Sequence, residues 1–325
     1  MKVVCLDLEQ QLIELKKYVS FKNSKKIKSL LFDKGYYRIS RFAKYLSKVS
    51  ISNTKPSIEQ LIRLYELDKD LRLLFVKYIK DIEIKFRNSI AIYLVKLDPN
   101  NPSAYLGETI YTKTRGLPNS SHRKSAIAKF PAFHNDLVDK EKKIRNGSTK
   151  FPDVTSFQKG GKYYHEKLPI WSFFEHVDFG TTVSLYEYLN GEARKKILSE
   201  SYGFINPTKD TTFMFDDWMH SIRGIRNKCA HYNRIIGHSG TIIKIYAKEK
   251  DSLELASATD LFSRVYSMCK IMDYNQLINF KEEFRRIVRK FEKNGQSVFD
   301  LNILPQNWDS QLKIFSSVSC KEVFL

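Results

Sequence analysis

The sequence predicts a mainly α-helical fold, on three observations. Apolar residues recur at steps of three and four in several long segments, which is the spacing of one face of an α-helix. Signals for β-strands are weak, since only 240–247 (GTIIKIYA) has the density of β-branched residues typical of a strand, and we expect at most a short hairpin or an extended edge there. No internal repeat is visible, which argues against a solenoid.

The helices follow in order along the chain. We expect residues 1–55 to form a basic N-terminal helical region. The next helix covers 56–97, because Ser57 followed by Gln60 has the spacing of a capping box and apolar residues then recur at helical steps. This segment is either one long helix or two helices broken near Asp68 and the acidic residue that follows it at position 70. Two prolines after position 97 end it.

A chain of 325 residues predicts about two domains, or one domain with large insertions. We expect 56–106 and 168–237 to form a helical core, with 107–167 inserted into it as long basic loops around short helices, because Gly, Ser, Pro and Asn are frequent there. Residues 238–325 should be a C-terminal helical extension packing on the core. Within these regions, helical spacing returns at 169–190, 192–201, 216–236 and 259–293.

The charge is the outlying property. Fifty-five Lys and Arg against 36 Asp and Glu give a net charge of +19. This charge favours a polyanionic partner, and nucleic acid is the leading class of such partners. A merely basic surface, caused by a bias toward AT-rich codons, is the alternative. The residues that could contact phosphate, or equally be solvated loop cations, are Lys25, Lys26, Lys28, Arg123, Lys124, Lys142, Lys143 and Arg145.

The four cysteines are spread over the chain without a CxxC pair, which fits neither a disulfide scaffold nor a zinc ribbon and favours the reducing cytoplasm. Acidic residues at positions 7, 9 and 14 argue against a secretory signal. Apolar stretches are far shorter than the roughly 20 residues that span a bilayer. We therefore expect a soluble cytoplasmic protein with no membrane contact, no cofactor and no bound metal.

One stretch carries the residues of a possible reaction, 216–237 (DDWMHSIRGIRNKCAHYNRIIG). Asp216 is a suitable N-cap and Gly237 a suitable C′ residue, so we expect one helix. At about 100° per residue, its buried face should carry Trp218, Ile222, Ile225, Cys229, Tyr232 and Ile236. The opposite ridge should carry Arg223, Asn227, His231 and Arg234, with Arg226 flanking it.

Such a ridge has the groups needed to cleave RNA without a metal. An imidazole can exchange protons with a 2′-hydroxyl or a leaving 5′-oxygen at neutral pH, and guanidiniums can stabilise the charge of a phosphorane. Asn227 can orient the imidazole or the phosphate. One His per chain is one short of an acid and base pair, so two copies facing each other across a twofold axis would complete a site. The alternative is an ordinary solvated helix face.

These residues resemble a known family. Arg226 to His231 (RNKCAH) resembles the Arg-polar-x3-His signature of the HEPN superfamily, and RNKCAHYNR resembles the Abi-like (abortive infection, AbiD/AbiF) proteins of bacterial phage defence. GYYRISRFAKYL (35–46), the segment 61–94, LPIWSFFEHVDFGTTVSLYEYL (168–189) and LPQNWDSQLKIF (304–315) resemble further blocks of that family in the same order.

The resemblance implies an α-helical HEPN bundle, dimerisation through the motif helices, and a metal-independent endoribonuclease that leaves a 2′,3′-cyclic phosphate. It also implies a toxin-like role in phage defence, checked by an antitoxin, which in some relatives is thought to be a structured small RNA. Arg226 and His231 match the catalytic positions and Asn227 the polar position. Arg223 and Arg234 are added from helical geometry. Tyr232 stands where many relatives have a second His, and we assign it no chemistry.

Two other functions stay open: a non-catalytic RNA-binding module that uses the same ridge, and an inert helical scaffold. Glu83 and Arg87 form an i,i+4 pair that is either a surface salt bridge or a contact to the motif helix. His220 is expected to be a bystander. Four aromatic residues are expected in the core: Trp171, Phe173, Phe174 and Phe179.

Overall fold

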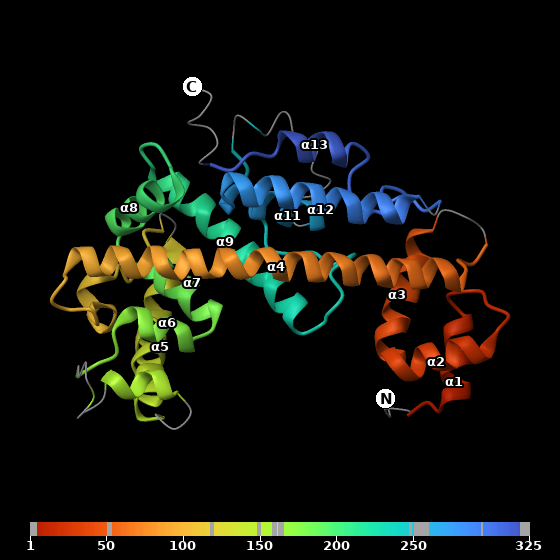
Figure 1. Ribbon diagram of the computed structural model, residues 1–325, viewed down its shortest axis with the longest axis horizontal. Coiled ribbons are helices and arrows are strands. Elements are labelled where there is room, and N and C mark those ends of the chain that lie inside the picture. Colours follow the sequence, from red (N-terminus) through yellow and green to blue (C-terminus); the bar gives the residue numbers. More distant parts are fainter. Residues whose placement is uncertain are drawn as a thin grey trace. The chain divides into compact units, whose positions relative to one another are not determined.

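The computed structural model describes residues 5–50, 54–117, 120–147, 151–157, 161, 166–246, 249, 260–293 and 295–318. Over these ranges the chain is helical and contains no strand, which confirms the mainly α prediction (Figure 1). The expected extended edge at 240–247 is irregular from 240 to 246, and residue 247 lies outside the described ranges. No helix in the described part of the chain is long and apolar enough to cross a membrane.

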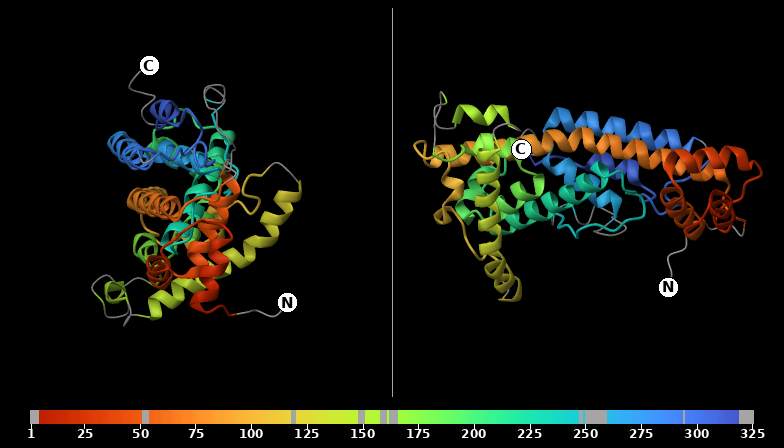
Figure 2. Two further views of the ribbon diagram at one scale, coloured as in Figure 1. Left: turned by 90° about the vertical axis from the view of Figure 1, so that its right-hand side faces the viewer. Right: turned by 90° about the horizontal axis from the view of Figure 1, so that it is seen from below.

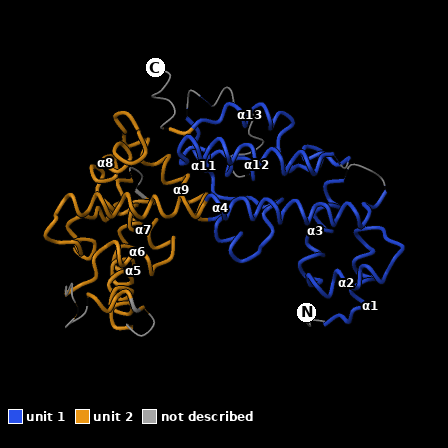
Figure 3. The backbone as a smooth tube through the Cα atoms, in the orientation of Figure 1, with its two compact units in different colours: residues 1–78, 224–316 blue, residues 79–223, 317–325 orange. Residues whose placement is uncertain are grey.

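The chain forms two compact units (Figure 3). Unit 1 comprises 1–78 and 224–316, and unit 2 comprises 79–223 and 317–325. The residues that divide the units fall inside two long helices, α4 (Ile58–Leu97) and α9 (Lys209–Ala230). The motif residues 226–231 therefore belong to unit 1, whereas Arg223 belongs to unit 2.

Unit 1 contains three small N-terminal helices that pack on one another, the first half of α4, the end of α9 and three C-terminal helices. Beyond α4 and α9, its helices are α1 (Leu8–Lys16), α2 (Ser24–Lys34), α3 (Tyr36–Val49), α11 (Leu261–Ile271), α12 (Tyr274–Glu292) and α13 (Trp308–Ile314). Figure 2 shows α12 running beside the first half of α4, where Phe280 stacks on Phe75 at 6.3 Å between ring centroids. These rings are part of a core shared by segments distant in sequence.

The helix α4 begins as the sequence predicts. The backbone N–H of Ser57 donates to Gln60 Oε1 at 2.7 Å, and the N–H of Gln60 donates to Ser57 Oγ at 3.3 Å, so the reciprocal capping box is present. The helix then continues without a break through Asp68, whose carboxylate is buried instead of marking a turn. Of the two possibilities that the sequence left open, one long helix is the right one.

Unit 2 is built around the second half of α4 and the start of α9. Its other elements are the short 3-10 turns Ala104–Leu106, Glu108–Ile110 and Pro152–Phe157, together with α5 (Ser120–Asn146), α6 (Ile170–His176), α7 (Phe179–Tyr188) and α8 (Gly191–Tyr202). Phe86 lies at the centre of an aromatic core, 5.2 Å from Tyr186, 5.9 Å from Phe215 and 6.1 Å from Phe179 between ring centroids. Such edge-on and tilted contacts are the arrangements that aromatic rings prefer.

Two predictions for unit 2 are wrong. The segment 107–167 was expected to be long loops around short helices, but 27 of its residues form one helix, α5, with Pro131 inside it. Phe130, Leu137 and Ile144 are buried at steps of seven, so an apolar seam stabilises this helix although its composition resembles a loop. Trp171 was expected in the core and is 45% exposed, whereas the three phenylalanines grouped with it are buried as predicted.

Two of the predicted helical segments are divided by capping residues. The segment 169–190 becomes α6 and α7 because Asp178 caps α7, accepting the N–H of Thr181 at 3.0 Å. The segment 259–293 becomes α11 and α12 because Asp273 and Gln276 form a capping box. The third segment, 216–236, starts earlier than predicted, at Lys209 in α9.

Candidate functional site

The motif helix α9 ends one residue before the motif histidine. The N–H of Asn233 donates to Lys228 O at 2.8 Å and the N–H of Tyr232 donates to Cys229 O at 3.1 Å, which is the bond pattern of a Schellman motif. His231 is then the C-cap, and Tyr232 is the C′ residue with φ of 55°. That backbone region usually takes glycine, so a tyrosine there is strained by about 1–2 kcal/mol.

The helix end corrects the predicted buried face. Tyr232 was expected to face the core but is 64% exposed, because the chain reverses at this residue instead of completing another helical turn. Ile236 is buried as predicted, although it lies beyond the helix. Gly237 has φ of 69° but is not the C′ residue; a Cβ at this position would collide with the ring of Tyr45, so close packing is its role.

The three predicted catalytic residues lie on the last two turns of α9 and its C-cap. Arg226 is half-buried, and Asn227 and His231 are exposed. Helical geometry separates Asn227 from His231 by about 40° around the axis but Arg226 from His231 by about 140°. Asn227 can therefore act beside His231 in one chain, whereas Arg226 and His231 point to different sides of the helix.

Of the two arginines added from helical geometry, Arg223 lies within α9 and Arg234 lies beyond its end. Arg234 lies past the helix end, where Nη1 donates to Arg41 O at 2.6 Å and the guanidinium lies over the ring of Tyr45, 5.1 Å from its centroid. The prediction that Arg234 continues the ridge is wrong, because the chain has left the helix. Arg223 is half-buried within unit 2, where its burial lowers its pKa and the nearby Asp178 partly offsets this effect.

A buried carboxylate that the sequence did not single out fixes the chain after the motif. Asp68 of α4 is fully buried, and its Oδ1 accepts the N–H groups of Ile235 at 2.8 Å and Ile236 at 2.9 Å. Its Oδ2 accepts from Arg72 Nε at 2.8 Å. The acidic residues at 68 and 70 suggested a helix break in the sequence. Only the fold brings Asp68 to Ile235 and Ile236, which lie 167 and 168 positions later in the chain.

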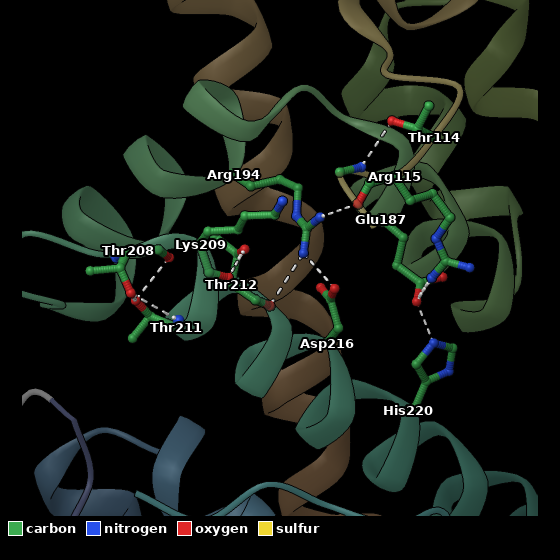
Figure 4. Close-up of polar contacts among 11 residues, drawn as sticks. Thr114, Arg115, Glu187, Arg194, Thr208, Lys209, Thr211, Thr212, Asp216 and His220 are labelled. Carbon is green, nitrogen blue, oxygen red and sulfur yellow. Dashed lines mark hydrogen bonds and ion pairs between the residues drawn. The ribbon is translucent and has the colours of Figure 1, made fainter. Parts of the chain in front are cut away.

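Unit 2 holds a second polar network that the sequence also missed (Figure 4). The imidazole of His220 donates through Nε2 to Glu187, which also pairs with Arg115. Burial, with Arg223 and Arg115 nearby, lowers the pKa of His220 to about 4, so this histidine is neutral at pH 7. His220 was expected to be a bystander to the motif, and in the structure it is a half-buried partner of Glu187.

Asp216 belongs to the same network. It was expected to be the N-cap of the motif helix, yet it lies inside α9, almost buried, and pairs with Arg194 of α8. Arg194 also donates to Thr212 O at 3.2 Å. The Arg194–Asp216 pair thus joins α8 to α9, a role that requires tertiary structure and has no local sequence signal.

The predicted salt bridge between Glu83 and Arg87 is present. Its side chains are only 13% and 15% exposed, so it is not a surface salt bridge. Arg87 donates to the backbone oxygens of Phe174 and, at 2.8 Å, Val177. These carbonyls end α6, and the guanidinium caps them as basic side chains at helix C-termini do.

The basic residues proposed to contact phosphate fall on the surfaces of two helices. Lys25 and Lys26 are exposed at the start of α2 in unit 1. Exposed cations at the two ends of α5 in unit 2 are Arg123, Lys124, Lys142 and Lys143. Arg145 differs, because its Nε donates to the buried carboxylate of Glu141 at 3.0 Å and is committed to packing.

A groove of about 450 Å³ in unit 1 adjoins the end of α9. Most of its charged residues are basic, and Tyr232 and the exposed Leu73 and Val76 give it an aromatic and aliphatic part. It is lined by Asp33, Lys34, Arg38, Tyr65, Lys69, Arg72, Leu73, Val76, Cys229, Ala230 and Tyr232. Among the described residues, no group of three or more His, Cys, Asp or Glu could hold a metal ion.

Comparison with known proteins places these features in one family. Residues 29–237, which include α3, α4, unit 2 up to α9 and the whole motif, match the family of Abi-like proteins. Neither the curated proteins nor the solved structures contain a significant match.

Proposed function

Because the chain belongs to the Abi-like family, whose name indicates a role in abortive infection of phage-infected bacteria, we propose that it is the RNA-cleaving effector of such a system. The proposed activity is that of a metal-independent, HEPN-type endoribonuclease acting in the cytoplasm. The observation that carries the proposal is the exposure of Asn227 and His231 at a fixed helix end. A reactive imidazole must reach solvent, as His231 does, and the hydrogen bonds of the helix end fix the backbone that carries it.

The reaction is an internal transesterification. His231 takes the proton of a 2′-hydroxyl, the 2′-oxygen attacks the adjacent phosphorus, and the bond to the 5′-oxygen breaks as that oxygen gains a proton. The products are a 2′,3′-cyclic phosphate and a 5′-hydroxyl. Arg226 would stabilise the extra negative charge of the phosphorane, and Asn227 would orient the imidazole or the phosphate.

The angular separation of Arg226 and His231 favours a site made by two copies of the chain. A guanidinium about 140° from the imidazole on one helix cannot flank the same phosphate as easily as a guanidinium from a facing helix. A twofold axis through the motif would also bring together two imidazoles, which supply the acid and the base. We therefore propose a homodimer through the end of α9, held inactive in the cell by an antitoxin such as a structured small RNA.

The first experiment is cleavage of RNA and DNA by the purified protein in EDTA. We expect RNA to be cut to cyclic-phosphate ends and DNA of the same sequence to stay intact, because DNA lacks the 2′-hydroxyl. His231→Ala and Arg226→Ala should each lower the rate at least 100-fold, whereas His122→Ala, which removes an exposed histidine of α5, should not change it. A requirement for added Mg²⁺, or unchanged cleavage by both motif variants, would refute the mechanism.

The second experiment tests the shared site by mixing inactive variants. If Arg226 and His231 of opposite chains act together, subunit exchange between the Arg226→Ala and His231→Ala proteins should restore part of the cleavage, because the heterodimers, about half of all dimers, keep one Arg226 and one of the two imidazoles on opposite chains. If both groups must come from one chain, the mixture stays inactive. The RNA-binding alternative makes a different prediction: Arg226→Ala weakens RNA binding, His231→Ala does little, and no cyclic phosphate forms.

A further inference from the structure

Five basic side chains from four segments gather beside the motif helix in unit 1. We call them the cation cluster: Arg41 of α3, Lys228 of α9, Arg234 and His238 of the following loop, and Arg264 of α11. Two of the guanidiniums are held by backbone carbonyls, since Arg264 Nη1 donates to His238 O at 3.0 Å and Arg234 Nη1 donates to Arg41 O at 2.6 Å. Neutral acceptors position these charges without cancelling them.

The cluster has a buried floor and a more open rim. Arg264 is 2% exposed, and its Nη2 is a buried nitrogen without a hydrogen-bond partner among the described residues. Arg234 Nε is likewise a buried nitrogen without a hydrogen-bond partner among the described residues. Gly240 lies against the Arg264 guanidinium so closely that a Cβ there would collide with Nη2. Because buried donors are seldom left unsatisfied, these nitrogens indicate a missing acceptor. The other three side chains of the cluster are half-buried and accessible from solvent.

The charges in the cluster repel one another. Burial, together with Lys228, Arg234, Arg41 and Arg264, lowers the pKa of His238 to about 4. Burial and the neighbouring arginines also lower the pKa of Lys228. Positive charges held this close, and more numerous than the carboxylates near them, form a site of high positive potential, which attracts anions.

The nearby carboxylates are already engaged. Asp68, whose charge favours the protonated form of Arg234, is bound to Arg72 and to two backbone N–H groups. Asp260, whose charge favours the protonated form of Arg264, caps α11 by accepting the N–H of Ser263 at 2.6 Å. Within the described residues, the cluster therefore keeps a positive excess, and a ligand with several oxygen acceptors would match it.

We propose that the cation cluster binds a phosphate group of the RNA, next to the one that is cut. The inference rests on the proposed function, because Lys228 lies between Arg226 and His231 in the motif and Arg234 follows His231 by three residues. A phosphodiester offers two charged oxygens for guanidinium and ammonium donors, and arginine is suited to this contact. The cluster would hold the strand in register while the groups at the end of α9 act on the neighbouring phosphate.

The proposal gives His238 a measurable property. A bound anion offsets the positive potential at the imidazole, so His238 should bind a proton more readily when the cluster is occupied. By linkage, each pKa unit that the anion adds to His238 means about tenfold tighter anion binding to the protonated form. The histidine thus reports directly on the charge bound at the cluster.

The first test titrates the histidines of the full chain by NMR, with inorganic phosphate as the probe and chloride at equal ionic strength as the control. We expect phosphate to raise the pKa of His238 by about one unit. Lys228→Met should reduce this effect, whereas Lys48→Met, which removes an exposed cation of α3, should not. No change at His238 at millimolar phosphate would overturn the anion site.

The second test measures binding of single-stranded RNA to the cleavage-deficient His231→Ala chain over a range of salt concentrations. Adding Lys228→Met should weaken binding about tenfold and lower the salt slope by roughly 0.7, the value for one lost contact to single-stranded phosphate, and Lys48→Met should do neither. If phosphate shifts His238 but Lys228→Met leaves RNA binding unchanged, the site serves a free phosphate compound and the assignment to RNA is wrong. RNA binding that depends on Lys228 in a protein that never cuts RNA would refute the proposed nuclease and keep the phosphate site.

Discussion

Removing the Asp68 carboxylate should be among the most destabilising single changes near the motif. Asp68→Ala deletes acceptors for two buried backbone N–H groups and leaves Arg72, which is 5% exposed, without its carboxylate. Each unsatisfied buried donor costs about 1–3 kcal/mol, and breaking a buried ion pair from one side costs about 3–5 kcal/mol. These contributions overlap, so we expect a loss of about 4–5 kcal/mol in the free energy of unfolding, a large part of the roughly 5–15 kcal/mol of a typical protein.

The assay is urea denaturation, combined with amide hydrogen exchange. The midpoint should fall in Asp68→Ala, and the amides of Ile235 and Ile236 should exchange faster because their acceptor is gone. Glu66→Ala is the matched control, since it breaks the exposed Lys69–Glu66 pair on the same helix and should cost less than about 1 kcal/mol. A loss below 1 kcal/mol in Asp68→Ala, or unchanged exchange at both isoleucines, would show that Asp68 does not anchor this loop.

Three further changes test the surrounding structure. Tyr232→Gly should stabilise the protein by about 0.5–1 kcal/mol in chemical denaturation, because glycine relieves the positive φ at an exposed position, whereas Tyr37→Gly, inside α3 and 75% exposed, should destabilise it by about 1 kcal/mol. Between pH 6.5 and 4 the unfolded chain binds a proton at His220 that the folded chain excludes, so stability should fall with falling pH, and His220→Gln should remove up to about 3 kcal/mol of that change. Asp216→Ala should cost about 3–5 kcal/mol in the same assay, because Arg194 is left buried and unpaired.

Helices were predictable where local spacing and capping determine them. The start of α4 follows from Ser57 and Gln60, and the helical segments at 169–190 and 192–201 follow from their apolar spacing. The divisions within 169–190 and 259–293 were missed, although Asp178 and Asp273 are good N-caps, because an aspartate inside an apolar pattern does not by itself interrupt it. A capping residue is recognised as one only when the preceding residue leaves the helix.

The segment that became α5 shows the opposite limit. Its many polar and basic residues and its proline resemble a loop, and its apolar residues are sparse enough to hide their seven-residue spacing. Helices of this kind are stabilised by packing more than by propensity, so the sequence alone underestimates them. Packing also decides the exposure of Trp171. A tryptophan in an apolar segment is expected in the core, but this one lies on the exposed side of α6.

The polar residues that join distant segments were the least predictable. Asp68, Glu187 and Arg264 each contact residues far away in the chain, and the sequence around them carries no signal for these distant partners. What the sequence did predict was the motif itself, because Arg226, Asn227 and His231 occupy adjacent turns and resemble a family signature. Local pattern identified the candidate reactive groups, while the fold was needed to identify the residues that fix them.

The helix end changes what those reactive groups can do. On the predicted continuous helix, Asn227, His231 and Arg234 would form one ridge, with a phosphate-binding guanidinium on the same surface as the imidazole. The Schellman turn at Tyr232 instead directs Arg234 into the cation cluster, away from the helix face that carries Asn227 and His231. Under the proposed mechanism, phosphate binding and proton transfer would fall to distinct groups of side chains. Because Arg234 has left the ridge and Arg226 lies about 140° from His231 around the helix, we propose that a second copy of the chain supplies the guanidinium that faces His231.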